Sequence, residues 1–584
     1  MRCFLCLAGC VLALSAGLTR ALAETPSQRL SDPARLLPEK TDIVVRLPQP
    51  RRFVETLLNL DLYQTVRQFS FGRELYDSTN LRRFRQLVAY FEKELGLPWP
   101  QLLDRLAARG AVVGVKIGPN PESALMVVAG DDDKLMRQFF QLALKILEQE
   151  LTRQEAKDVP VKGTYKGIDT VSVGNQFYAA LVEGTLLFAN SETALHAGLD
   201  RLHGDTKCIV DLPSYMEANK ILPSDPLISF WLNMETVKQS PQAKALYTAP
   251  PRDDPGLTVL FGHYLDLLGR SPFVCAAIHR DKEGLVTSIR LPRGREGMGA
   301  DRLLHLAPPG VPGTRPLLEP RNVLYSESNY FDLANVWKER KKLFNEKQVA
   351  AFEKFDSQAF PFLGGVKPSR LLTRTAPYYR FVAAHRDKNE YKTPPKISIP
   401  AFALVWELRE PEAFGKSMET ILRGVALLTG SQVDLKLVEE KYKGFNLIGY
   451  RFPEDKPIKG DINDLRFNFT PCFTRVGDRF IVSSTVSLCR ELVDIVQAEG
   501  TSPHRGDSAT TRRRFYGAGA TEYLRTIEDL LITQTTLDRA VSPQEARKEM
   551  KAQLEAIGKL GFFSLEPRLT DKAFQYDIRL SSAK

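Results

Sequence analysis

The stretch that decides the fold is YKGIDTVSVGNQFYAALVEGTLLFANSETAL, residues 165–195. It opens with Tyr165-Lys166-Gly167 between two extended segments, where we expect the glycine to adopt a positive φ in a hairpin turn. Two more strands follow, Gln176–Val182 and Thr185–Asn190, and a helix begins at Ser191. Strands that are grouped as hairpins, with helices between the groups, predict an antiparallel α+β fold rather than a doubly wound parallel sheet.

The same order of elements occurs again in the second half of the chain. Tyr442-Lys443-Gly444 precedes strands at Cys472–Val476 and Arg479–Ser483 and a helix near Thr485. Before each turn, a strand and a helix with apolar residues at helical spacing also correspond. Each half closes with a long hairpin that ends in Ile-Arg-Leu. The sequence therefore predicts two tandem copies of one antiparallel-sheet unit, each with its helices packed on one face of the sheet.

A segment rich in proline and glycine separates the two copies. Residues 292–321 contain six prolines and five glycines, a density that disfavours regular structure. We therefore expect a first α+β repeat at residues 24–291, a linker at 292–321 and a second repeat at 322–584. A chain of 584 residues is also too long for a single compact core.

The N-terminus has the pattern of a secretory signal peptide, residues 1–23. Arg2 supplies a positive charge, Phe4–Leu18 is mostly apolar, and Ala21-Leu22-Ala23 offers small residues for cleavage. We expect the mature chain to begin at Glu24 and to be exported to the periplasm or secreted. The alternative is a bacterial lipoprotein signal at Leu7-Ala8-Gly9-Cys10, but its apolar stretch is shorter than a signal peptide needs.

Composition and charge exclude several classes of protein. Hydrophobic residues make up 43% and charged residues 26%, as in ordinary globular proteins, so a collagen-like or wholly disordered chain is excluded. No apolar run of about 18 residues follows the N-terminus, so we expect no transmembrane span in the mature chain. The net charge of +10 favours anionic envelope components as partners, and export argues against nucleic acid.

Four cysteines remain after removal of the signal peptide: Cys208, Cys275, Cys472 and Cys489. Four cysteines in a chain of this length are not a disulfide framework. Cys472 falls on a predicted strand and Cys489 on the next predicted helix, so a single bridge between them is one interpretation. Buried free thiols are the other.

The chain resembles a known family in its turn and cap residues. These are the start Leu37-Pro38 through Pro48, the Tyr-Lys-Gly turn, and apolar strands that end in small polar residues before a helix, as at Phe188–Ser191. In these features and in its duplication it is similar to an exported bacterial family of tandemly duplicated α+β proteins, filed as a domain of unknown function. The second copy departs from the pattern because it lacks the Leu-Pro start and carries an insertion around Pro453–Phe469. The resemblance implies no catalytic residue, ligand or partner.

Common catalytic and cofactor motifs are absent from the sequence: the nucleophile elbow, the H-E-x-x-H zinc motif, the P-loop and the dinucleotide-binding glycine motif. His196, Asp200 and His203 would lie on one face of a helix, which could supply three metal ligands. The second copy has Arg490, Asp494 and Gln497 there, so a function shared by both copies would not use the histidines. We therefore assign no catalytic, metal or cofactor-binding residue.

Two cationic stretches, Lys338–Lys342 and Arg512–Arg514, could meet phosphate or carboxylate groups. Because charge runs usually form solvated faces, we expect that structural role for both.

These observations favour an exported, non-catalytic, duplicated envelope protein that acts through binding or scaffolding surfaces. One alternative is a carrier of a lipid or other apolar ligand, held in a cleft between sheet and helices. The other is an enzyme, such as a hydrolase, without a recognisable motif, because catalytic groups can be assembled from distant residues.

Overall fold

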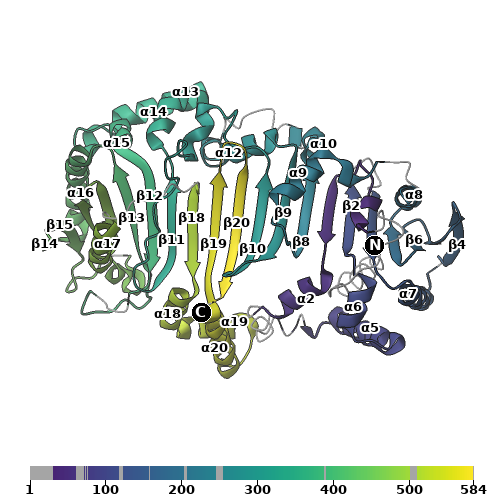
Figure 1. Ribbon diagram of the computed structural model, residues 1–584. Coiled ribbons are helices and arrows are strands. Elements are labelled where there is room, and N and C mark those ends of the chain that lie inside the picture. Colours follow the sequence, from purple (N-terminus) through teal and green to yellow (C-terminus); the bar gives the residue numbers. More distant parts are fainter. Residues whose placement is uncertain are drawn as a thin grey trace. The chain divides into compact units, whose positions relative to one another are not determined.

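The computed structural model has an α+β fold (Figure 1). The residues that it describes are 31–60, 72, 74, 76–117, 123–156, 158–202, 207–241, 243–244, 254–386, 390–458, 460–499 and 509–582. The expected signal peptide lies outside them. Within the described part, no helix combines the length and the apolar character needed to cross a membrane. Internal contacts divide the chain into unit 1, Met1–Ala243 with Ser271–Pro292, and unit 2, Lys244–Arg270 with Arg293–Lys584.

The sheet of unit 1 is antiparallel throughout. Its described strands are ordered β10-β9-β8-β1-β2-β3-β7-β6-β5-β4. The strands are β1 (Ile43–Leu47), β2 (Ala111–Lys116), β3 (Ser123–Ala129), β4 (Pro160–Tyr165), β5 (Ile168–Val173), β6 (Phe177–Val182), β7 (Thr185–Ala189), β8 (Ile228–Asn233), β9 (Phe273–Arg280) and β10 (Gly284–Leu291). The helices are η1 (Pro33–Leu36), α2 (Pro50–Leu58), α5 (Thr79–Leu95), α6 (Trp99–Leu106), α7 (Asp133–Arg153), α8 (Glu192–Asp200), η2 (Ile209–Asp211), α9 (Pro213–Ile221) and α10 (Met234–Gln239).

Helices cover both faces of the unit 1 sheet, so the expectation that they pack on one face is wrong. Alternate residues of β3 and β7 fall into two core clusters: Leu125, Val127, Leu187 and Ala189 pack with α8, whereas Met126, Val128, Leu186 and Phe188 pack with α7. Because both strands are apolar at successive positions, each face needs its own cover. Asp132 caps α7 by accepting a hydrogen bond from the Leu135 amide, and Ser191 caps α8 by accepting one from the Ala194 amide.

The sheet of unit 2 is also antiparallel, and its described strands are ordered β20-β19-β18-β11-β12-β13-β17-β16-β15-β14. This order repeats that of unit 1 strand for strand. The strands are β11 (Val323–Tyr330), β12 (Thr375–Ala384), β13 (Ala401–Leu408), β14 (Lys436–Tyr442), β15 (Phe445–Arg451), β16 (Cys472–Val476), β17 (Arg479–Ser483), β18 (Thr511–Tyr516), β19 (Leu560–Leu569) and β20 (Phe574–Ser582).

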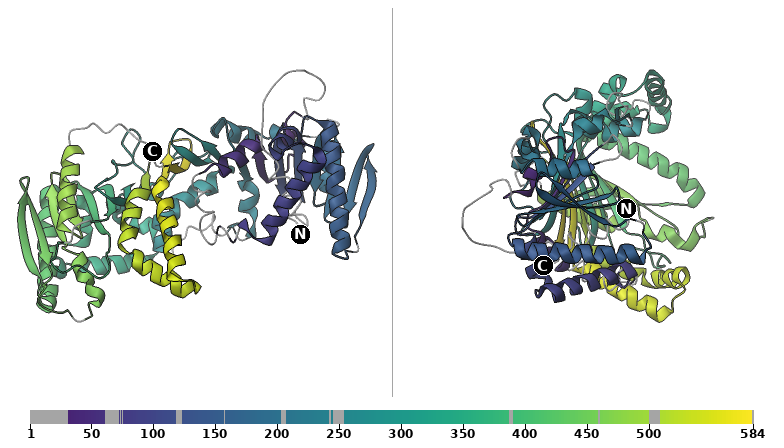
Figure 2. Two further views of the ribbon diagram at one scale, coloured as in Figure 1. Left: turned by 90° about the horizontal axis from the view of Figure 1, so that it is seen from below. Right: turned by 90° about the vertical axis from the view of Figure 1, so that its right-hand side faces the viewer.

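The helices of unit 2 also lie on both faces of its sheet. In β13, Ala403 and Val405 pack with α17, whereas Trp406 and Leu408 pack with α16. Helices α18, α19 and α20 pack on one another through a separate apolar cluster (Figure 2, yellow-green and yellow). The helices are α12 (Pro255–Arg270), η3 (Ala300–His305), α13 (Leu333–Leu343), α14 (Glu346–Gln358), η4 (Pro361–Leu363), α15 (Pro368–Arg374), α16 (Pro411–Val433), η5 (Ile462–Asn468), α17 (Val486–Glu499), α18 (Gly517–Thr526), α19 (Glu528–Arg539) and α20 (Pro543–Lys559).

The two Tyr-Lys-Gly turns have the expected conformation. Lys166 and Gly167 join β4 to β5 with φ values of 49° and 80°, and Lys443 and Gly444 join β14 to β15 with 49° and 87°. Two successive residues with positive φ are typical of a type I′ hairpin turn, in which the second residue is usually glycine. The prediction of a positive φ at each glycine is confirmed.

Part of the proline- and glycine-rich segment is packed against unit 2. Leu304 of η3 lies in an apolar cluster with Leu343 of α13, and Leu318 is fully buried in the cluster that contains α17. Gly294 approaches the backbone of Thr570 so closely that a Cβ atom would lie 2.3 Å from its carbonyl oxygen. Leu304, Leu318 and Gly294, which fall in the segment predicted as a linker, are therefore packed into unit 2.

Candidate functional site

In the described structure, Asp200 of α8 holds a hairpin turn in place. It accepts a hydrogen bond from the Tyr165 hydroxyl at 2.9 Å and forms an ion pair with Lys166 at 2.7 Å. The Tyr165 ring stacks on His196, with ring centroids 3.6 Å apart. His203 lies outside the described residues. Among those that are described, no group of three or more His, Cys, Asp or Glu side chains could hold a metal ion.

Unit 2 contains the same contact between turn and helix. The Tyr442 hydroxyl donates to Asp494 at 2.9 Å, and Lys443 pairs with Asp494 at 2.7 Å. In both units, the hydrogen bond from the lysine and then that from the tyrosine hold the pKa of the aspartate below its ordinary value. The Tyr-Lys-Gly turn and the helix aspartate each occur in both halves of the sequence. The structure shows that the two features contact each other in both units.

The cationic stretch on β18 is paired with carboxylates. Arg513 forms an ion pair with Glu327 of β11 at 2.7 Å, and Arg514 pairs with Glu319 at 3.2 Å. Their side chains are 43% and 27% exposed, so both arginines are ion-paired and still reach solvent. In the other stretch, Arg340 pairs with Glu353 at 2.8 Å and Lys342 with Glu339 at 2.7 Å, on the surface of α13.

One face of the unit 2 sheet carries a continuous row of aromatic rings. We call this set the aromatic row; it takes one residue from each of five neighbouring strands: Phe563 of β19, Phe515 of β18, Tyr325 of β11, Phe381 of β12 and Phe402 of β13. Successive ring centroids are 6.1, 4.6, 6.0 and 6.5 Å apart. Phe515 is 47% exposed, Phe402 43% and Phe563 36%. Large apolar side chains gathered at this degree of exposure are typical of an interaction surface.

A charged side chain, Glu327 of β11, lies beside Tyr325 of the aromatic row. Glu327 accepts hydrogen bonds from the Tyr325 hydroxyl at 2.6 Å and from Arg513 at 2.7 Å. Although burial acts to raise the pKa of Glu327, these hydrogen bonds hold it below its ordinary value. The carboxylate is therefore ionised at neutral pH and has its charge balanced by Arg513, which suits a structural role better than proton transfer.

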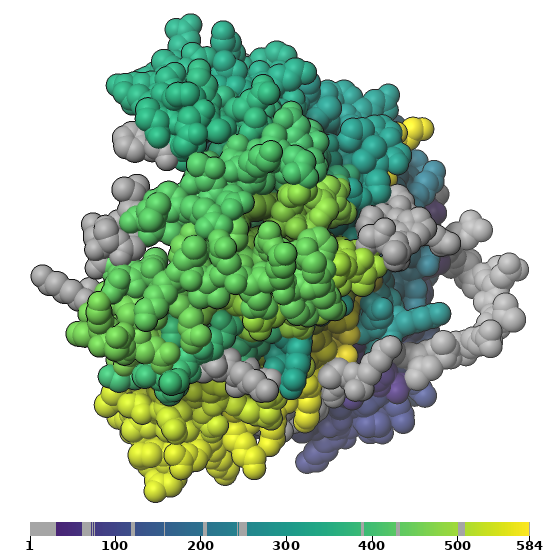
Figure 3. Space-filling model, turned by 90° about the vertical axis from the view of Figure 1, so that its left-hand side faces the viewer, coloured from purple at the N-terminus to yellow at the C-terminus, as the bar shows by residue number. Residues whose placement is uncertain are grey.

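The aromatic face continues from β13 towards α16. Trp406 of β13 lies opposite Phe480 of β17 with ring centroids 6.2 Å apart, and Phe473 of β16 follows at 6.0 Å. Between strands β14 to β17 and helix α16 lies a half-open cavity of about 730 Å³. Its floor is formed by Phe445, Ile448, Phe473 and Phe480, and charged side chains surround it. The end of unit 2 that carries β14 and α16 faces the viewer in Figure 3.

The cavity reflects the way α16 packs. Its counterpart in unit 1, α7, buries five apolar side chains: Leu135, Met136, Phe139, Ala143 and Leu147. Among the α16 side chains that the structure describes, only Phe414 and Ile421 are buried to this degree, whereas Val425 and Leu427 are exposed. A volume of about 730 Å³ is within the range of small-molecule sites in proteins.

A smaller cavity of about 230 Å³ lies beside the start of α17. Glu390 lines it and accepts hydrogen bonds from the Ser487 amide at 2.6 Å and from the Thr470 hydroxyl. A carboxylate at the N-terminus of a helix is stabilised by the helix dipole and by the free amide groups. Glu390 therefore stabilises the N-terminal end of α17.

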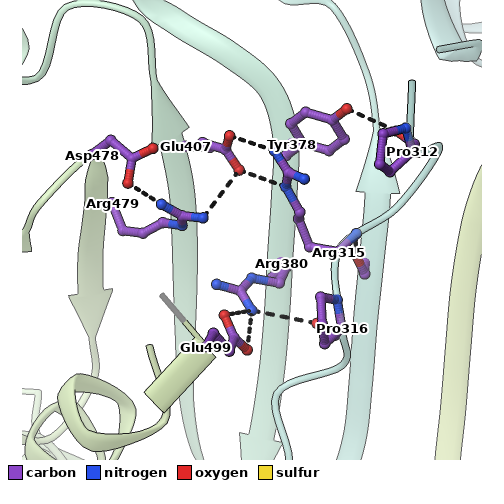
Figure 4. Close-up of polar contacts among 10 residues, drawn as sticks. Pro312, Arg315, Pro316, Tyr378, Arg380, Glu407, Asp478, Arg479 and Glu499 are labelled. Atoms are coloured by element: carbon purple, nitrogen blue, oxygen red, sulfur yellow. Dashed lines mark hydrogen bonds and ion pairs between the residues drawn. The ribbon is translucent and has the colours of Figure 1, made fainter. Parts of the chain in front are cut away.

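On the opposite face of the sheet, a network of ion pairs fixes the proline-rich segment (Figure 4). Arg315 forms two hydrogen bonds to Glu407, at 2.8 and 2.7 Å, and its guanidinium lies 4.0 Å from the ring centre of Tyr378. The Tyr378 hydroxyl donates to the Pro312 carbonyl at 2.7 Å. Arg380 pairs with Glu499 at 2.6 Å. The charged groups of these two ion pairs are mostly buried, so each needs its partner: removing one would leave a buried charge without compensation.

The fold and its surfaces define the class of the protein: an α+β protein built on antiparallel sheets, with an exposed aromatic face and without a described metal cluster. Residues 111–259 match the model of a family described as "Protein of unknown function (DUF3352)". The chain thus contains a DUF3352 domain, in agreement with the resemblance noted from the sequence.

Among curated proteins, none matches the chain. Among solved structures, crystal form I of TP0453 is similar with a TM-score of 0.23 and 10% identity, over 47% of this chain and 86% of that chain. Crystal form III of TP0453 gives a TM-score of 0.24 and 10% identity, over 47% and 88%. Similarity at this level carries no argument about function.

Proposed function

We propose that the protein is an exported, non-enzymatic binding protein and that the aromatic row of unit 2 is its binding surface. The observation that carries this proposal is the run of five rings on five adjacent strands, three of them more than a third exposed. Exposed aromatic side chains lose unfavourable contact with water when a partner covers them, and they dominate the energetics of many interfaces.

Cross-linking from within the row tests the proposal. Phe515 is replaced by a photo-reactive phenylalanine derivative in cells that export the protein, and Leu537 of α19, which is 75% exposed, is replaced in the same way as a control. We expect a discrete cross-linked adduct from position 515 and none from position 537. Loss of this adduct in the background of Phe402→Ser and Phe563→Ser would tie it to the row. Equal labelling from both positions, or none from position 515, would contradict the proposal.

A second candidate function is transport of an apolar ligand, and the cavity beneath α16 favours it. Four of its sixteen lining residues are apolar or aromatic, and its volume is that of a small-molecule site. Eight others are charged, so the ligand that fits best has an apolar part and a polar part. Native mass spectrometry of the purified protein would show a bound ligand as a defined mass increment. Replacement of Ile448 by Trp, which adds volume to the cavity floor, should remove that increment. A protein that carries no ligand when purified, and binds none from added lipid vesicles, would exclude this candidate.

The hydrolase alternative has less support. His385 lines the cavity beside α17 with Glu390, but the Glu390 carboxylate is already hydrogen-bonded to the Ser487 amide and the Thr470 hydroxyl. His263 and His305 have pKa values lowered by burial, and they pack on each other with ring centroids 4.8 Å apart. His305 also stacks on Phe331 and contacts the Val259 carbonyl at 2.8 Å. Neither histidine lines the cavity beneath α16 or the one beside α17.

We also propose that the two units arose by tandem duplication. The identical strand orders, the helices on opposite faces, and the contacts of Tyr165 and Lys166 with Asp200 and of Tyr442 and Lys443 with Asp494 support this origin. In an experimental structure, superposition of the two sheets should bring the two Tyr-Lys-Gly turns onto each other. Turns on non-equivalent strands would contradict duplication.

A further inference from the structure

Two cysteines from different elements meet in the core of unit 2. Cys472 is the first residue of β16, and Cys489 lies in the second turn of α17. Both are buried thiols and belong to the same apolar cluster. The fold therefore brings together the pair that the sequence left as either a bridge or two free thiols.

The backbone of Thr485 fixes how close the two residues lie. Its carbonyl oxygen accepts a hydrogen bond from the Cys472 thiol at 3.4 Å and another from the Cys489 amide at 3.1 Å. Both groups thus point at one carbonyl oxygen, which places Cys472 beside the start of α17, the helix that carries Cys489. In unit 1, by contrast, the thiol of Cys208 donates to Asp211 at 3.0 Å, and Cys275 lies nearest to backbone carbonyls.

The surroundings make the pair unreactive once the protein has folded. Burial, followed by the neighbouring Cys489 thiol, raises the pKa of the Cys472 thiol well above its ordinary value. Because the thiolate is the reactive form, a folded, reduced pair exchanges slowly with disulfides in solution. Disulfide formation at this site therefore has to take place while the chain folds, before the two thiols are buried.

We infer that Cys472 and Cys489 form a disulfide that joins β16 to α17 when the chain folds in an oxidising compartment. One thiolate attacks a small disulfide such as oxidised glutathione, which gives a mixed disulfide and releases one glutathione. The second thiolate then displaces the other glutathione. In total, the two cysteines lose two protons and two electrons, and one glutathione disulfide is reduced to two thiols. In the cell, the inference rests on the export that we propose above.

The bridge would be specific to unit 2. Cys472 pairs in register with Ser483, the last residue of β17, as Tyr178 pairs with Ala189 at the end of β7. By this register, Tyr178 occupies the position of Cys472 in unit 1. Tyr178 packs against the apolar cluster of unit 1, so unit 1 has no thiol at this position.

Thiol counting tests the inference in vitro. The mature chain, residues 24–584, is unfolded in urea, refolded with oxidised and reduced glutathione, quenched with N-ethylmaleimide in denaturant, and weighed by mass spectrometry. We expect two maleimide adducts, on Cys208 and Cys275, and a cross-linked peptide that contains Cys472 and Cys489. After reduction there should be four adducts. Four adducts without reduction, or a bridge between other cysteines, would overturn the inference.

A variant and a cellular sample complete the test. Cys489→Ala should leave Cys472 without its partner and raise the count from two adducts to three, which is a readout that does not depend on stability. Protein taken from the cell envelope and quenched at harvest should show the same two adducts as the refolded wild type. A bridge that forms in vitro but is absent from cellular protein would count against the proposed export. A bridge absent from both would refute the inference itself.

Discussion

Glu407 provides the sharpest test of how the proline-rich segment is held on unit 2. Its side chain is 13% exposed and accepts two hydrogen bonds from Arg315, and Arg479 approaches it to 3.7 Å. Replacing Glu407 by Gln removes the only negative charge that contacts Arg315 among the described residues, and leaves two guanidinium groups near each other. Breaking a buried pair in this way costs about 3–5 kcal/mol, because a buried charge is left without compensation.

The free energy of unfolding of unit 2 can be followed by tryptophan fluorescence. Trp337 and Trp406 belong to unit 2, so replacing Trp99 and Trp231 of unit 1 by Phe leaves a signal specific to unit 2. Urea titration of this protein should show a lower midpoint in Glu407→Gln at an unchanged slope. The matched control is Glu522→Gln in α18 of unit 2, which removes an exposed ion pair with Arg525 worth at most about 1 kcal/mol.

The double variant Arg315→Met, Glu407→Met separates charge from packing. Replacing both partners of a buried pair by apolar residues is often neutral, so it should recover most of the stability that Glu407→Gln loses. A loss of less than about 1 kcal/mol in Glu407→Gln would refute the view that this ion pair holds the segment.

Three further predictions follow from the structure and the sequence. Gly167→Ala and Gly444→Ala should each lower the free energy of unfolding by about 1 kcal/mol, since an added Cβ meets no atom within 4 Å but strains a positive φ; Gly424→Ala, within α16, should not destabilise. The folded pKa of Glu327 is held below its ordinary value, so its contribution to stability is complete above that ordinary value and is lost as the pH falls through the lowered one. In acid, the urea midpoint should therefore fall less steeply with decreasing pH in Glu327→Gln than in the wild type. Intact-mass analysis of exported protein should show a chain that begins at Glu24; a lipid-sized increment on Cys10 would contradict this.

Much of the local structure could be predicted because it depends on neighbours in the sequence. The turn glycines, the caps of α7 and α8, and the antiparallel hairpins follow from backbone sterics and from side chains within a few residues. The placement of helices on both faces was missed, although the unbroken apolar runs of β3 and β7 are a signal for it. The aromatic row was also missed, because its members are spread from Tyr325 to Phe563.

By itself, the sequence determined the α+β class, the repeated order of elements and the conformation of the two Tyr-Lys-Gly turns. Only the tertiary structure decided which distant residues meet: Arg513 with Glu327, Arg315 with Glu407, and Cys472 with Cys489. The physical reason is that a hairpin turn is fixed by the torsion angles of a few residues, whereas these contacts depend on strand order and register across the whole sheet.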